Sequence, residues 1–168
     1  MGTKKHKEKG PRHVKVGVIS VSSTRSLAED KSGHWISRRA KREKHDVLFH
    51  QLVPDNVETI RQTLREVVNT YDPQAILMTG GTGISGKDVT IEAVRPFFDK
   101  ELTAFGHLFT QLSFEDIDTA ALLSRATAGV MGETVLFCMP GSLKACKLAC
   151  KALIFPELGH IVGHIQEG

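Results

Sequence analysis

Short runs of β-branched and aliphatic residues alternate along the chain with segments whose apolar residues recur three and four positions apart. The short runs predict buried strands at 14–21, 47–53, 75–79 and 134–139. The helical spacing predicts helices at 34–45, 56–69, 90–96, 102–112, 119–128 and 142–154, and the polar residues of 22–33 predict a loop. Strands that alternate with helices predict an α/β fold, a three-layer α/β/α sandwich with a mainly parallel sheet.

The length and charge distribution of the chain favour one domain with a basic extension. The 168 residues suffice for one core, and no internal repeat is visible. The net charge is +3, but residues 1–15 hold six cations and one acid, so the remainder is slightly acidic. We expect a disordered basic tail at 1–13 and a single domain at 14–168. Because no aromatic residue lies among the tail's charges, we expect no nucleic-acid partner.

The hydrophobic pattern of the sequence predicts no membrane-spanning segment and no secretory signal. No apolar run reaches the roughly 18 residues that span a bilayer, and the N-terminus lacks the apolar core of a secretory signal. The three cysteines are an odd number without a C-x-x-C pair, which is typical of a reduced compartment. We therefore expect a cytoplasmic protein with no membrane partner.

The stretch MTGGTGISGKDVT, at 78–90, follows the third predicted strand and holds four glycines in seven positions. Glycine lets a backbone approach a ligand closely, so that successive N–H groups converge on phosphate oxygens. The stretch also matches G-x-G-x-x-G, but it follows the wrong strand for a dinucleotide fold. It nearly matches a P-loop, but Asp88 replaces the required Ser or Thr. A plain strand-to-helix turn is the remaining alternative.

Two aspartates follow predicted strands. Asp55 comes after the second strand, and Asp88 lies in the glycine-rich stretch after the third. Carboxyl ends of parallel strands meet at one edge of a sheet, where ligands bind. Paired carboxylates there suit Mg²⁺, which also binds substrate phosphates. The alternatives are that Asp55 caps the next helix, with Glu58 as the reciprocal acid, and that Asp88 is an ordinary loop residue.

Longer motifs extend across residues 14–165: TGGTGISGKDVTIEAVRPFFDKEL, AFGHLFTQLSFEDI, LLSRATAGV and MPGSLKAC followed by PELGHIV. With them the chain resembles the MoaB/MogA family of molybdenum cofactor biosynthesis proteins, related to the G domain of gephyrin, and SGHWI favours its MoaB branch. The resemblance implies a homo-oligomer, a trimer or hexamer. It also implies adenylylation of molybdopterin by Mg-ATP, which releases pyrophosphate, and hand-over of the product to a molybdate-inserting protein.

Position by position, the resemblance assigns roles to residues of this chain. Asp55 and Asp88 match the catalytic, magnesium-binding acids. The phosphate loop, the helix behind it and the pterin pocket are implied at Gly80, Gly81, Thr82, Gly83, Thr90, Glu92, Ser113, Pro140, Gly141, Ser142 and Lys144. Lys87 stands where relatives often have Arg, and a lysine cannot grip a phosphate with two parallel bonds.

Other interpretations of the chain stay open at this point. One is a non-catalytic molybdopterin-binding or scaffold protein of the same pathway, and another is a nucleic-acid-associated protein that uses the basic tail. Cys146 with Cys150 and His160 with His164 have the i, i+4 spacing of metal ligands. Nothing in the sequence completes a ligand cluster, so we interpret them as buried thiols and surface or interface histidines.

Overall fold

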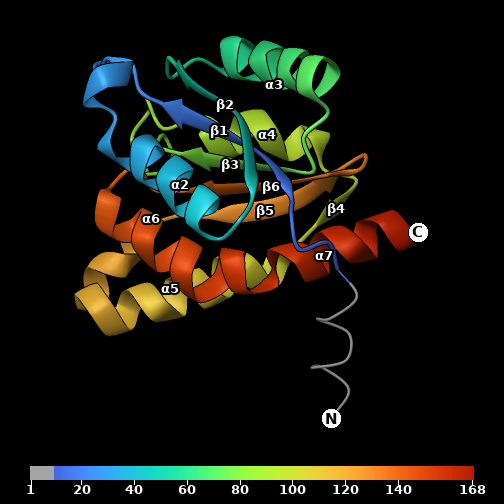
Figure 1. The fold of residues 1–168 in the computed structure, drawn as a ribbon. Helices are drawn as coiled ribbons and strands as arrows, with labels where there is room; N and C mark the ends of the chain where they lie inside the picture. Colours follow the sequence, from blue (N-terminus) through green and yellow to red (C-terminus); the bar gives the residue numbers. More distant parts are fainter. Residues whose placement is uncertain (1–9) are drawn as a thin grey trace.

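Six strands form one mixed sheet in the computed structural model, which describes residues 10–168. The strand order is β2-β1-β3-β6-β5-β4 (Figure 1). The bounds are β1 Lys15–Val21, β2 Asp46–Val53, β3 Ala75–Thr79, β4 Lys100–Glu101, β5 Thr127–Met131 and β6 Thr134–Met139. The strands β2, β1, β3 and β6 are parallel, and β5 and β4 are antiparallel to their neighbours. This confirms the predicted α/β fold.

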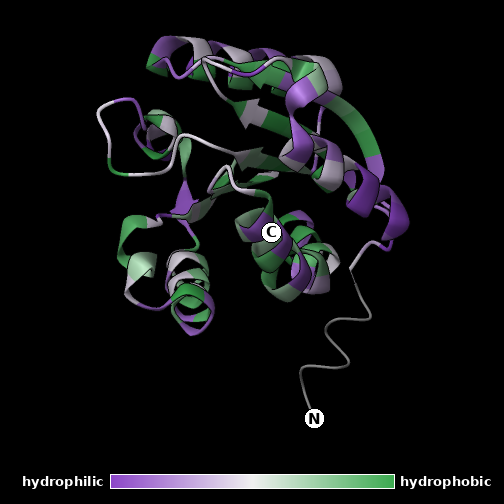
Figure 2. Ribbon diagram, turned by 90° about the vertical axis from the view of Figure 1, so that its left-hand side faces the viewer, coloured by the Kyte–Doolittle hydropathy of each residue, from purple (hydrophilic) through white to green (hydrophobic). Residues whose placement is uncertain are grey.

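Helices cover both faces of the sheet (Figures 1 and 2). One face packs against α2 Lys31–Arg42, α5 Thr103–Ile117, α6 Leu143–Ala149 and α7 Phe155–Glu167, and the other against α3 Val57–Tyr71 and α4 Thr90–Val94. In β1, Val16 and Val18 face the first layer, and Ile19 and Val21 face the second. Burial on both faces explains why these strands are continuous apolar runs.

The helix predicted at 34–45 begins and ends three residues earlier, as α2. Asp30 is its N-cap: its buried carboxylate accepts from the N–H of Gly33 at 3.0 Å. Leu27–Glu29 forms a short 3-10 turn before it. The loop predicted for 22–33 is therefore shorter than expected, because a buried cap starts the helix inside it.

The prediction of a helix at 119–128 is wrong. The 3-10 helix η3 spans Asp118–Leu123 and is followed by β5, which forms a hairpin with β6. The two strands are joined at Gly132 and Glu133, and Gly132 has a φ of +60°. Glycine adopts a positive φ without strain, so it allows a tight turn that pairs β5 with β6. Residues 127–131 therefore form a strand, where the sequence pattern predicts the end of a helix.

The C-terminal helix extends beyond the predicted end at Ile154. The π-helix Cys150–Ile154 joins α6 to α7 just before Pro156, where a wider turn accommodates a residue with no N–H. Contrary to the sequence expectation, the continuous run Leu143–Glu167 is long and apolar enough to cross a membrane by length and composition. Its buried residues pack against the core of the domain: Cys146, Ala149, Cys150, Ile154, Leu158 and Val162.

The predicted basic tail lies mostly outside the described residues. Its last part, 10–13, is described and lies against the body of the domain. A Cβ added to Gly10 would collide with the backbone of Gly159 on α7. The ring of His13 bonds through Nδ1 to the carbonyl of Lys44 at 2.6 Å. These residues are therefore in contact with the folded domain.

Candidate functional site

A cavity of about 330 Å³ lies where β1, β2, β3 and β6 end at the same edge of the sheet. Loops that follow these four strands line it. The predicted site residues among its lining are Asp55, Gly80, Gly81, Thr82, Gly83, Asp88, Pro140 and Gly141. The structure thus brings both predicted acids and the glycine-rich loop 80–88 to one cavity, as the parallel topology requires.

Asp55 is held by the loop that follows β1. Its Oδ2 accepts from the N–H of Ser23 at 2.8 Å and from the Ser23 hydroxyl at 2.9 Å. The interpretation of Asp55 as a helix cap is wrong, because Asn56 caps α3 by accepting from the N–H of Thr59. A Cβ added to Gly81 would lie 3.1 Å from Asp55 Oδ1. The carboxylate therefore faces the glycine-rich loop.

Asp88 is held in a matching way by a residue of its own loop. Its Oδ2 accepts from the hydroxyl of Ser85 at 2.7 Å and from the Ser85 N–H at 2.9 Å. The Ser85 hydroxyl bond, followed by backbone N–H bonds, holds the pKa of Asp88 below its ordinary value despite some burial. A Cβ added to Gly83 would lie 2.7 Å from Asp88 Oδ2, so only glycine allows this approach.

The loop 80–83 has a backbone that favours glycine. Gly80 and Gly81 have φ values of +97° and +67°. Thr90, at the start of α4, holds this backbone: its hydroxyl donates to the carbonyl of Gly80 at 2.8 Å and its N–H to that of Gly81 at 2.9 Å. Thr90 is therefore a support of the loop.

The hydroxyl of Thr82 has no hydrogen-bond partner in the protein, although Thr82 is only 2% exposed. A buried polar group without a partner costs on the order of 1–3 kcal/mol, and such groups are rare. Thr82 lines the same cavity as the two acids. The orphaned hydroxyl is therefore evidence of a ligand oxygen or ion that binds at this loop.

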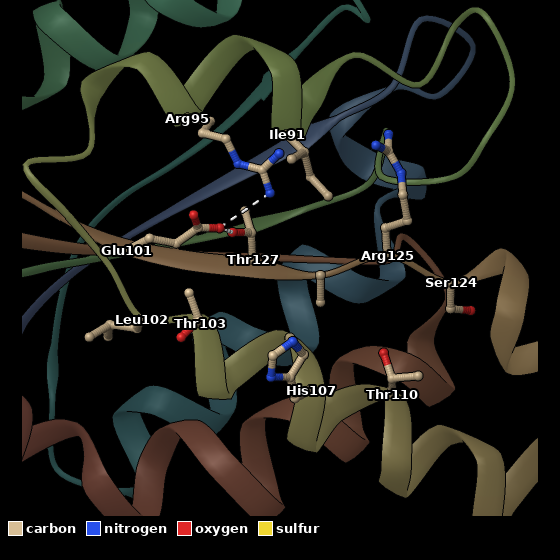
Figure 3. A pocket seen from close by; sticks show the side chains of 12 residues that line it. Ile91, Arg95, Glu101, Leu102, Thr103, His107, Thr110, Ser124, Arg125 and Thr127 are labelled. Carbon is tan, nitrogen blue, oxygen red and sulfur yellow. Dashed lines mark hydrogen bonds and ion pairs between the residues drawn. The ribbon is translucent and has the colours of Figure 1, made fainter.

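Arg125, which the sequence analysis did not single out, supports the loop from behind. Its Nε donates to the carbonyls of Thr82 and Gly83, each at 3.0 Å. The N–H and C=O of a trans peptide point in opposite directions, so the N–H groups that follow these carbonyls point away from Arg125. Figure 3 shows its guanidinium group turned away from His107 and Thr110.

Glu92 holds the Arg125 side chain. Arg125 Nη1 lies 2.6 Å from Glu92 Oε1, and Nη2 lies 3.3 Å from Oε2. This two-pronged pair lowers the pKa of Glu92 and raises that of Arg125. Glu92 therefore acts on the loop through Arg125. The motif LLSRATAGV includes Arg125, but the sequence pattern predicts a helix at 119–128. In that helix, the contact of Arg125 with the glycine-rich loop is not apparent.

Three residues predicted for the pterin pocket lie outside this cavity. Ser113 is 4% exposed within α5, and Ser142 caps α6 by accepting from the N–H of Ala145 at 3.1 Å. Lys144 Nζ pairs with Asp116 Oδ2 at 3.1 Å, beside a separate groove. From this predicted group, only Pro140 and Gly141 line the cavity.

The donor set of the cavity fits a small, hard cation together with phosphate. Two carboxylates and a hydroxyl are the oxygen ligands that Mg²⁺ prefers, and Mg²⁺ keeps water and substrate phosphates in its other positions. Among residues 10–168 no group of three or more His, Cys, Asp or Glu side chains forms a complete metal site.

Known proteins share this sequence and fold. The sequence model of the family described as "Probable molybdopterin binding domain" matches residues 17–160. The chain is 43% identical over 162 residues to molybdenum cofactor biosynthesis protein B of Bacillus cereus, and this match covers 96% of each of the two chains. It is 35% identical over 164 residues to the probable molybdopterin adenylyltransferase of Methanocaldococcus jannaschii, covering 94% of this chain and 97% of that one.

Solved structures agree with the sequence comparisons. A crystal structure of a molybdenum cofactor biosynthesis protein B superposes with a TM-score of 0.90 at 42% identity, over 94% of this chain and 99% of the other. The tungsten cofactor synthesizing protein MoaB of Pyrococcus furiosus gives a TM-score of 0.85 at 36% identity, over 93% and 99%. By sequence and by fold, this chain belongs to the MoaB/MogA family of molybdopterin-binding domains.

Proposed function

We propose that the protein acts in molybdenum cofactor biosynthesis and adenylylates molybdopterin with Mg-ATP. The observation that carries this proposal is the orphaned Thr82 hydroxyl, buried in a glycine-rich loop that lines one cavity together with Asp55 and Asp88. A phosphate chain with its magnesium ion supplies partners for all three groups. Membership of a family described as molybdopterin-binding, with a relative named as a probable adenylyltransferase, supports the same substrates.

In the proposed reaction the terminal phosphate of molybdopterin attacks the α-phosphorus of ATP. A new P–O bond forms, the bond to the β-phosphate breaks, and pyrophosphate leaves with the electron pair. A phosphate nucleophile is already ionised at neutral pH, so the chain needs no general base. Magnesium, when bound, neutralises charge on the phosphate oxygens.

The residues of the chain position the phosphates and balance their charge. Asp55 and Asp88 provide oxygen ligands for the ion, and the N–H groups of the glycine-rich loop donate hydrogen bonds to phosphate oxygens. Arg25, which also lines the cavity, adds a positive charge beside the loop. Transfer of this kind depends on positioning and electrostatics rather than on covalent help from side chains.

The test of this function is pyrophosphate release from purified protein with molybdopterin, ATP and Mg²⁺. We expect Asp88→Asn and Asp55→Asn to lower the rate by about a hundredfold or more. Asp72→Asn is the matched control, because Asp72 is an exposed carboxylate that ends α3. Wild-type protein that binds molybdopterin but releases no pyrophosphate would instead support the non-catalytic alternative.

We also propose that the chain forms a homo-oligomer, a trimer or hexamer. Exposed apolar side chains gather on α5 and η3, where Leu122 is 82% exposed; the others are Leu108, Phe114, Ile117 and Leu123. Contiguous apolar surface of this kind is typical of interfaces. Light scattering should show a multiple of the 18.5 kDa chain mass, and Phe114→Glu should lower it.

The setting of this activity is part of the same proposal. All three cysteines are free and buried, which fits a reducing, cytoplasmic compartment. The adenylylated product would then pass to a protein that inserts molybdate. Pull-down of a product-dependent complex from cytoplasmic extract tests this step, and an interaction that is independent of product would contradict it.

A further inference from the structure

A pair of histidines on α7 takes no part in the function proposed above. His160 and His164 lie one helical turn apart, with Nε2 atoms 2.9 Å from each other and ring centroids 4.7 Å apart. They stand at the edge of a second cavity, of about 480 Å³, which Asp99 and Lys100 also line. This cavity is separate from the one that holds the glycine-rich loop.

The hydrogen bonds of the pair select one tautomer for each ring in its neutral form. His160 Nδ1 lies 3.0 Å from Glu157 Oε2, and an ionised carboxylate only accepts hydrogen bonds. His160 therefore carries its proton on Nδ1, and its Nε2 has a free lone pair. His164 Nε2 donates to that lone pair, which leaves His164 Nδ1 unprotonated, 4.0 Å from Glu167 Oε2.

The spacing of the two Nε2 atoms is that of neighbouring ligands on a metal ion. Imidazole nitrogens bind Zn²⁺ at about 2.0–2.1 Å, so two of them at a right angle stand about 2.9 Å apart. A tetrahedral angle requires about 3.3 Å. The observed 2.9 Å is the length of a hydrogen bond between the two rings, and it shows that both Nε2 atoms lie close enough to reach one ion. Cu²⁺ and Ni²⁺ bind imidazole nitrogens at right angles.

We propose that His160 and His164 bind one divalent transition-metal ion of the Cu²⁺ or Ni²⁺ class through their Nε2 atoms. On binding, the proton of His164 Nε2 moves to His164 Nδ1, which faces Glu167, and the Nε2 lone pairs of both rings bind the ion. Glu157 and Glu167 then each oppose the outer nitrogen of a ligating ring, an arrangement that orients metal-binding histidines in proteins generally.

Water completes the coordination of this ion. Within residues 10–168 no third His, Cys, Asp or Glu joins the pair to make a cluster of three. A site with two protein ligands exchanges its ion with solvent, and its affinity follows the general order for nitrogen ligands, with Cu²⁺ above Ni²⁺. The i, i+4 spacing on α7 places both rings on one side of the helix before the ion arrives.

Titration of the full chain with Ni²⁺ by calorimetry, and with Cu²⁺ by electron paramagnetic resonance, tests the site. We expect one ion per chain and a Cu²⁺ spectrum with two imidazole nitrogens. His160→Ala and His164→Ala should each remove this binding, and Glu157→Gln should weaken it by about tenfold. Circular dichroism checks that each variant is folded.

Two further histidine variants serve as matched controls. His107→Ala removes an exposed histidine of α5, and His6→Ala removes one that precedes the described residues; both should bind the metal as the wild type does. The proposal is overturned if the wild type binds no ion saturably, if both α7 variants bind it normally, or if His6→Ala abolishes binding. Pyrophosphate release should be unchanged in the α7 variants, so the two proposals fail independently.

Discussion

Replacing Arg125 with methionine isolates the contribution of one side chain to the geometry of the glycine-rich loop. Methionine keeps the apolar length of arginine but removes its charge and all its donors. The carbonyls of Thr82 and Gly83 lose the Nε bonds of 3.0 Å, and Glu92 loses its partner. Arg125 is hydrogen-bonded to neither acid of the cavity, but its charge also helps to lower the pKa of Asp88. An effect on catalysis therefore combines the shape of the loop with the loss of this charge.

The size of the effect follows from these contacts. Hydrogen bonds from a charged donor contribute about 1.5–3 kcal/mol. The pair with Glu92 adds about 1 kcal/mol or less, because the Arg125 side chain is 35% exposed and solvent screens it. Water replaces part of what is lost, so we expect a net loss of about 2 kcal/mol, or a Tm lower by about 4–8 °C.

The matching kinetic effect is on phosphate binding. If the loop N–H groups lose their orientation, we expect KM for ATP to rise by about tenfold or more. Arg125→Lys, which keeps the charge but not the forked geometry, should lie between the wild type and Arg125→Met. Pyrophosphate release at varied ATP measures KM, and thermal unfolding measures Tm.

Arg95→Met is the control for this experiment. Arg95 and Arg125 both line a separate cavity of about 300 Å³ beside α5, and Arg95 pairs there with Glu101 at 3.2 Å (Figure 3). Its hydrogen bonds do not reach the glycine-rich loop, so its loss should leave KM for ATP unchanged. An unchanged KM in Arg125→Met, or equal changes in both variants, would refute the role assigned to Arg125.

Three further predictions concern buried polar groups. Thr82→Val keeps the shape of Thr82 and removes its orphaned hydroxyl, so the free protein should gain up to about 1 kcal/mol in urea unfolding while ATP binding weakens. Burial would raise the pKa of Asp30, but hydrogen bonds from Ser20, Gly33 and His50 outweigh it and lower the pKa. Asp30 thus stabilises the fold above its unfolded pKa and loses this contribution as pH falls through its folded pKa; urea unfolding between pH 7 and pH 2, compared with Asp30→Asn, checks this. Burial raises the pKa of all three thiols, so iodoacetamide at pH 8 should label them only after unfolding.

The central strands were predictable because strands that are buried on both faces consist of nearly continuous apolar residues. β1 and β3 are nearly continuous apolar runs, and each ends where the cavity begins. The strand β5 was not predictable in this way. Its sequence, Thr-Ala-Gly-Val-Met, becomes a strand through pairing with β6, an interaction that local spacing does not reveal.

The difference between local and long-range signals also explains which site residues could be predicted from the sequence and which one could not. Asp55 and Asp88 were found because they directly follow predicted strands at one edge of the sheet. Arg125 acts across more than forty residues of sequence, on the carbonyls of Thr82 and Gly83. It reaches them from the approach to β5, so the error that placed a helix there also hid this contact.

The two acids of the cavity are oriented by the same device, although they belong to different loops. In each, Oδ2 accepts from both the N–H and the hydroxyl of one serine, Ser23 for Asp55 and Ser85 for Asp88. Both serine pairs leave Oδ1 outside these bonds. A carboxylate fixed through one oxygen presents the other in a defined direction, which suits single-oxygen ligation of an octahedral ion. The buried, unpartnered hydroxyl of Thr82 in the same cavity lining is then the cost of a site shaped for a ligand before it binds.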